Sequence, residues 1–265
     1  MGKTFFKILL ATLSFLSFAG CEGKEDNPSS GGGLVELKAT LATYVAPSGT
    51  QVPKWKNSSQ IVVFDMKSGK SATSKAAMAE MASSDFTMKI EAIAPGDECI
   101  AATPAAKMSI VGGRNLKTVI PAQQDGTEGE ALLAGKFTHS KLDKVTLNAL
   151  MSYLSINIAD DNFSVQKVEV KTVSANDRIA GDAVYSDDLS VASCTESTIT
   201  VVPATPVSCA NGGASIPVMI APGTVKDGIA LSITVSTGEV INDTIQGPVE
   251  LKAGSVLNVG AKSQN

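Results

Sequence analysis

The sequence contains few of the residues from which catalytic and stacking sites are built. It has one histidine, one tryptophan and four cysteines in 265 residues, and aromatic residues make up 5%. With His139 alone, we expect neither a His-based metal cluster nor a Ser–His–Asp triad, and we interpret His139 as an exposed polar residue. Trp55 is interpreted as a core residue, because one tryptophan is poor material for stacking on sugars. The sequence therefore predicts no enzyme and no cofactor.

Positive charge and long apolar runs are also scarce. The formal net charge is −4, which argues against nucleic acid as a partner. The apolar run from Phe5 to Phe18 is too short for a transmembrane helix. Because Lys3 and Lys7 place positive charge at its N-terminal end, we interpret residues 1–20 as a signal peptide.

Two small residues, Ala19 and Gly20, precede Cys21, in a pattern that resembles a bacterial lipobox. Signal peptidase needs small side chains at its cleavage site, so we expect cleavage between Gly20 and Cys21. Acyl chains on Cys21 would then anchor the protein to the outer membrane, because several chains together hold stably. The alternative is an ordinary secretory signal with a coincidental cysteine. The acidic run 22–26 resembles a surface-export signal, and its alternative is a solvated tether.

The rest of the sequence has an all-β composition, rich in Val, Ile, Thr, Ser and Ala, with 23 Gly and 11 Pro as turn residues. After a tether at 21–33, apolar residues alternate with polar ones, and roughly thirteen short strands are expected. A helix is expected only at 70–82, where Ala and Met fill the segment and Ser71 or Ser74 could cap it. We predict two β-sandwich domains, residues 34–140 and 141–265. Cys194 and Cys209 are candidates for a disulfide across one hairpin, unless strand register keeps them apart.

Four segments, taken in their order along the chain, resemble the fimbrillin-like family, which comprises the Mfa-like subunits of type V pili on Bacteroides-type bacteria. They run over 55–65, 119–135, 145–173 and 220–257. The resemblance implies two transthyretin-like sandwiches and a role as a lipid-anchored fimbria subunit in assembly or adhesion. Implied partners are other fimbrial subunits and host or bacterial surface ligands. Such subunits polymerise when a strand of one is replaced by a strand of its neighbour, which is β-augmentation.

The resemblance also assigns roles to individual residues. The strand to be exchanged would be the first one, whose apolar face is Val35, Leu37, Ala39 and Leu41. Stalk subunits are cut after an arginine beyond this strand, but this chain has no arginine before Arg114. We therefore expect an uncleaved anchor, a tip subunit, or a lysine-directed cut at Lys54 or Lys56.

Asp243-Thr244-Ile245 resembles the O-glycosylation site of these bacteria, with Thr244 as the acceptor. The rival hypothesis for the whole protein is a carbohydrate-binding surface lipoprotein of a glycan-uptake system.

Overall fold

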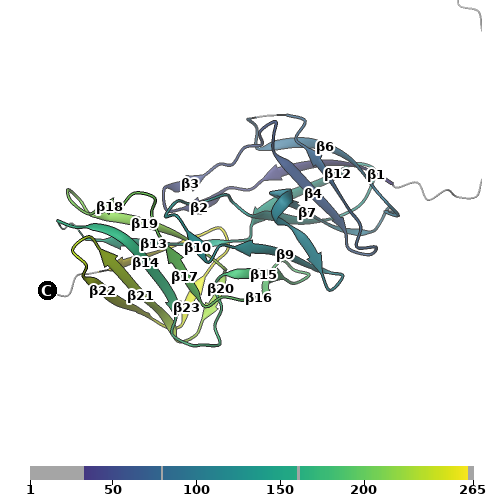
Figure 1. The fold of residues 1–265 in the computed structure, drawn as a ribbon. Helices are drawn as coiled ribbons and strands as arrows, with labels where there is room; N and C mark the ends of the chain where they lie inside the picture. The colour runs from purple at the N-terminus through teal and green to yellow at the C-terminus, as the bar shows by residue number, and fades with distance from the viewer. Residues whose placement is uncertain (1–32, 79, 160–161, 262–265) are drawn as a thin grey trace, which may run out of the picture. The chain divides into compact units, whose positions relative to one another are not determined.

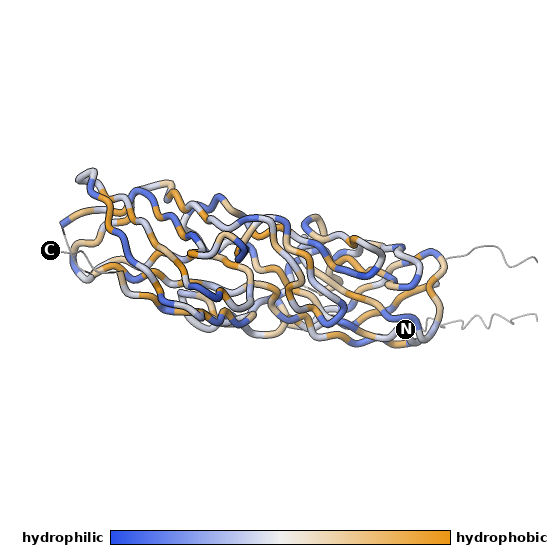
Figure 2. The backbone as a smooth tube through the Cα atoms, turned by 90° about the horizontal axis from the view of Figure 1, so that it is seen from below, coloured by the Kyte–Doolittle hydropathy of each residue, from blue (hydrophilic) through white to orange (hydrophobic). Residues whose placement is uncertain are grey.

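The structure is a computed structural model, and it describes residues 33–78, 80–159 and 162–261. These residues form strands and one short 3-10 helix, η1 (Ala105–Lys107), so the all-β prediction is confirmed. Hydrophilic and hydrophobic residues alternate along many strands (Figure 2). This alternation follows from the pleat, which turns successive side chains to opposite faces of a sheet.

Seven of the twelve strands from β1 to β12 form one sheet (Figure 1). Its order is β5-β4-β7-β11-β12-β1-β6. The strands are β1 (Gly33–Leu41), β4 (Gln60–Asp65), β5 (Ser71–Lys75), β6 (Ser83–Ile90), β7 (Glu98–Thr103), β11 (Leu133–Thr138) and β12 (Asp143–Ala149). Only β1 and β12 pair in parallel; the other neighbours are antiparallel. One face of this sheet encloses a core that includes Trp55, Phe86 and Leu147.

Three further sheets surround a second, larger core. One has the order β10-β17-β14-β21-β22, with β18 also on β14; another is β19-β13-β24; the third is β16-β15-β9-β8. Their strands are β8 (Ser109–Val111), β9 (Asn115–Ile120), β10 (Gln123–Gln124), β13 (Ser152–Ile158), β14 (Ser164–Thr172), β15 (Gly181–Tyr185), β16 (Val191–Ser193), β17 (Thr198–Val201), β18 (Val207–Ser208), β19 (Ala214–Ile220), β21 (Gly228–Val235), β22 (Val240–Gln246) and β24 (Val256–Ala261). Two small ladders pair β2 (Tyr44–Ala46) with β3 (Gly49–Gln51), and β20 (Gly223–Val225) with β23 (Val249–Leu251).

Strand pairing crosses the predicted boundary between residues 140 and 141. Strand β12 lies after the boundary but joins β1 and β11, and β9 lies before it but pairs with β15. Each of the two cores draws on residues from both sides. The division into domains at 34–140 and 141–265 stays a prediction.

The helix predicted at 70–82 is wrong. Residues 71–75 form β5, which pairs with β4, and no helix is assigned among the described residues 70–78 and 80–82. Ser71, Thr73 and Ser74 are weak helix formers, and the open edge of β4 offers backbone partners that an isolated helix in this segment would not gain. Ala76 instead packs into the core.

Candidate interaction site

Strand β1 fills the space between β6 and β12, which we call the β1 slot. Every residue from Gly33 to Thr40 has a partner on β6, and those from Leu37 to Leu41 also have partners on β12. The four residues of the predicted apolar face, Val35, Leu37, Ala39 and Leu41, are all buried, at 0%, 2%, 0% and 7% exposure. The chain therefore places at its N-terminal side a strand with ladders on both edges and one fully apolar face.

Trp55 lies against this strand, in agreement with its prediction as a core residue. It is 1% exposed, and its indole Nε1–H donates to the Ala39 carbonyl over 3.1 Å. Its ring meets Phe86 edge-on, with centroids 4.9 Å apart and planes at 68°, a favourable arrangement for two aromatic rings. The two lysines predicted as processing positions, Lys54 and Lys56, flank Trp55 and are exposed.

The segment between β1 and Trp55 is hydrogen-bonded to two residues that are distant in sequence, Glu128 and Gly254. In the β2–β3 hairpin, the Val45 amide donates to the Gly254 carbonyl over 2.9 Å, and the Ser48 amide to a Glu128 carboxylate oxygen over 2.6 Å. Burial, and then the negative charge of Glu128, raise the pKa of Tyr44 above its ordinary value. The sequence did not indicate this hairpin, because two strands of three residues leave little periodicity to detect.

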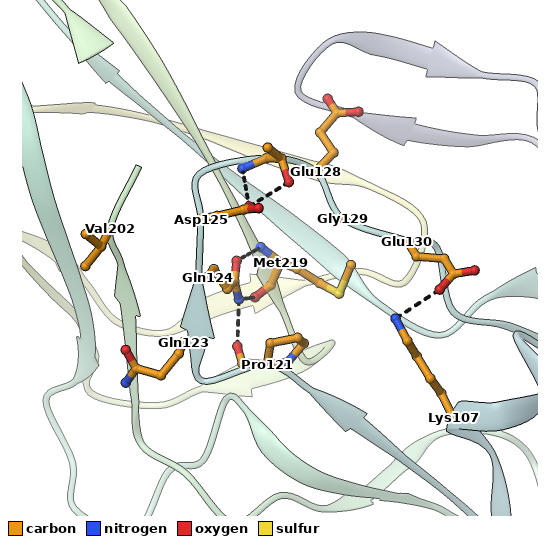
Figure 3. A pocket seen from close by; sticks show the side chains of 11 residues that line it. Lys107, Pro121, Gln123, Gln124, Asp125, Glu128, Gly129, Glu130, Val202 and Met219 are labelled. Carbon is orange, nitrogen blue, oxygen red and sulfur yellow. Dashed lines mark hydrogen bonds and ion pairs between the residues drawn. The ribbon is translucent and has the colours of Figure 1, made fainter. Parts of the chain in front are cut away.

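A hollow of about 460 Å³ lies beside Glu128 (Figure 3). Gln124 is one of its lining residues: its amide nitrogen donates to the carbonyls of Pro121 and Met219, and its amide oxygen accepts from the Met219 amide. Lys107 and Glu130 form an ion pair of 3.0 Å at its edge, where both are exposed. The lining combines apolar and polar side chains, as binding hollows for small ligands do. The sequence did not indicate this hollow, because its lining comes from separate segments.

His139 is buried, at 6% exposure, so its interpretation as an exposed residue is wrong. Its Nδ1 lies 2.7 Å from a carboxylate oxygen of Asp143, whose other oxygen accepts from the amide and hydroxyl of Ser140. Asp143 begins β12 and pairs in register with Leu37 of β1. The pair therefore lies where β12 begins to pair with β1, beside the middle of that strand. The sequence did not indicate this contact, because a histidine and an aspartate four residues apart form no distinctive motif.

Cys99 is buried close to Asp143. Burial, and then the negative charges of Asp65, Asp143 and Asp97, raise the pKa of its thiol to about 12. Asp97 itself accepts from the Ala94 amide and pairs with Lys67, and these contacts hold its pKa below the ordinary value. Within the described residues, no group of three or more His, Cys, Asp or Glu is arranged to hold a metal ion.

The remaining predicted sites lie apart from the β1 slot. Thr244 is exposed on β22, which forms an edge of its sheet. Cys194 follows β16 and Cys209 follows β18, in different sheets, so the expected single hairpin does not connect them; their pairing stays a prediction. Gly20 and Cys21 fall outside the described residues. In the part of the chain that the structure describes, no helix is long and apolar enough to cross a membrane.

Comparison with known proteins gives matches in structure alone. No family model matches the chain, and no curated protein matches its sequence. A Bacteroides ovatus protein assigned to cell adhesion superposes with a TM-score of 0.54 at 12% identity, over 86% of this chain and 92% of that one. A second such protein, from Bacteroides uniformis, gives 0.53 at 14%, over 87% and 93%. A tip fimbrial protein from Porphyromonas gingivalis with C-terminal truncation gives 0.44 at 10%, over 88% and 97%.

The first two likenesses show that this chain has the fold of those proteins. This agrees with the resemblance to the fimbrillin-like family drawn from the sequence.

Proposed function

We propose that this protein is a fimbrillin-like surface protein, anchored in the outer membrane by lipid on Cys21, which serves as a structural or adhesive fimbria subunit. It is not an enzyme in this proposal. Its partners are other fimbrial subunits, and host or bacterial surface ligands. Assembly proceeds by strand exchange. An uncleaved chain keeps both its lipid on Cys21 and β1, as an anchor does, whereas a chain cut after β1 loses this N-terminal part and takes a strand from a neighbouring subunit in place of β1.

The observation that supports strand exchange is the position of β1. The strand is N-terminal, is followed by a segment with two exposed lysines, and lies between β6 and β12 with its whole apolar face buried. Its loss would leave two rows of backbone groups and an open apolar groove. A strand from another subunit can pair with these backbone groups and fill the groove. Its main-chain hydrogen bonds supply affinity, and the pockets for its side chains supply selectivity.

The test is the N-terminus of the protein on the cell surface, measured by mass spectrometry of surface-released material. An acylated Cys21 as the sole N-terminus supports an anchor that keeps β1. An N-terminus directly after Lys54 or Lys56, together with SDS-labile polymers, supports an exchanging stalk or tip subunit. A chain that is intact from Met1 and found inside the cell would overturn the surface assignment.

A second candidate function is carbohydrate binding by a surface lipoprotein of a glycan-uptake system. The hollow beside Glu128 favours it, because its size suits one or two sugar rings and Gln123 and Val202 offer polar and apolar surface there (Figure 3). Electrophoresis in polysaccharide-containing gels tests it. Retardation that is lost in Gln123→Ala supports this function, whereas unchanged mobility across neutral and acidic polysaccharides counts against it.

A further inference from the structure

We propose that Trp55 determines which strands the β1 slot accepts, because it requires a small side chain at the position of Ala39. The inference rests on the proposed function and specifies the partner's chemistry. The acceptable strand carries large apolar residues at alternate positions on one face, and a small residue at the third of these positions.

Two small core-facing side chains of the slot lie next to each other. Ala39 of β1 pairs in register with Ser84 of β6, and both are 0% exposed. The next core-facing pair is much larger, Leu37 with Phe86. The Trp55 indole donates to the Ala39 carbonyl and meets the Phe86 ring, so it lies where the small pair leaves space in the core.

A larger side chain at position 39 has no space available. Trp55 is 1% exposed and belongs to a core in which Val145 and Leu147 of β12 are also buried. Protein interiors are packed to the density of organic crystals, and added methylene groups displace neighbours from their preferred rotamers. A leucine in place of Ala39 must therefore push the indole away from the carbonyl that it binds.

Trp55 belongs to the accepting side of the slot and does not depend on β1 for its backbone position. Its amide donates to the Met81 carbonyl over 2.8 Å, and its carbonyl accepts from the Glu80 amide over 2.6 Å. Met81 leads directly into β6. A cut after Lys54 leaves Trp55 in place, whereas a cut after Lys56 removes it. Of the two exposed lysines, the inference therefore selects Lys54 as the processing position that keeps the slot selective.

The first experiment is a double-mutant cycle in the full chain, read by urea unfolding with far-UV circular dichroism. Ala39→Leu should lower the urea midpoint in the wild-type background, and much less in a Trp55→Leu background, where the shorter side chain leaves space. Lys38→Leu is the matched control, because it adds apolar volume on the exposed face of the same strand. An equal loss from Ala39→Leu in both backgrounds overturns the inference, as does a loss no larger than that of the control.

The second experiment separates this inference from strand exchange itself. A full-length variant with a site for a sequence-specific protease between Val52 and Lys54 is nicked, and a labelled peptide of residues 33–42 is added in excess. The peptide with Ala39 should enter the slot, and the Ala39→Leu peptide should bind about ten- to a hundredfold more weakly. Equal binding of the two overturns the role of Trp55. Entry of neither peptide overturns strand exchange, and the double-mutant cycle then decides the role of Trp55 within the chain.

Discussion

Substitution of Leu37 by alanine should weaken β1 in its slot by a calculable amount. Leu37 is 2% exposed and belongs to the same core as Trp55. The substitution removes about three carbon groups, which at about 0.8 kcal/mol each account for about 2.4 kcal/mol. The cavity left behind brings the loss in free energy of unfolding to about 3–4 kcal/mol. For a domain of this size, the melting temperature should fall by roughly 6–16 °C.

The single tryptophan makes the assay specific to this part of the molecule. Trp55 is hydrogen-bonded to β1, so its emission should shift to the red when β1 leaves, and circular dichroism reports the loss of sheet structure as a whole. Both signals are followed during urea unfolding. For Leu37→Ala, the unfolding free energy obtained from the tryptophan signal should fall by the full expected amount, about 3–4 kcal/mol. The control Lys38→Ala, at an exposed position, should stay within about 0.5 kcal/mol of wild type.

A loss below about 1 kcal/mol for Leu37→Ala would refute the reasoning, because it would mean that the apolar face of β1 contributes little to the core. If the midpoint of the tryptophan signal shifts and the midpoint of the circular dichroism signal does not, the two cores unfold separately. A separate free energy of unfolding must then be determined for each core.

Three further predictions concern the surroundings of the slot. Gly135→Ala should prevent β11 from pairing as it does, because the added Cβ would lie 2.2 Å from the Thr146 carbonyl oxygen; we expect a loss of soluble protein, measured by expression and gel filtration. Asp143→Asn should cost about 2–4 kcal/mol in urea unfolding, because the buried His139 contact and two further hydrogen bonds lose a charged acceptor; a change under about 0.5 kcal/mol would contradict it. The raised pKa of Cys99 means that the folded chain keeps this thiol proton to higher pH than the unfolded chain does. The stability contributed there is complete below the ordinary thiol pKa of about 8.5 and is lost as pH rises towards about 12; urea midpoints measured from pH 7 to 12 should fall less steeply in Cys99→Ala.

The sequence by itself determined the class of fold and the first strand. Alternation over Val35 to Leu41 is strict, and a period of two can place all four apolar side chains on one face only if the segment is a strand. The burial of Trp55 was predicted from composition, because a single tryptophan in a sequence with 5% aromatic residues is poor material for a stacking surface.

Only the tertiary structure determined which strands pair with each other. The parallel pairing of β1 with β12 joins residues about a hundred positions apart, and no local pattern encodes which distant edge a strand will meet. The same holds for residues 71–75, where alanine and methionine around the segment favoured a helix until the edge of β4 supplied hydrogen-bond partners. The prediction for His139 was wrong because its polar partner, Asp143, is buried with it where β12 begins to pair with β1. The local period of apolar side chains determines a strand and its two faces. Contacts that exist only after the sheets have assembled determine the register of the strands, the burial of single polar groups and the packing position of Trp55.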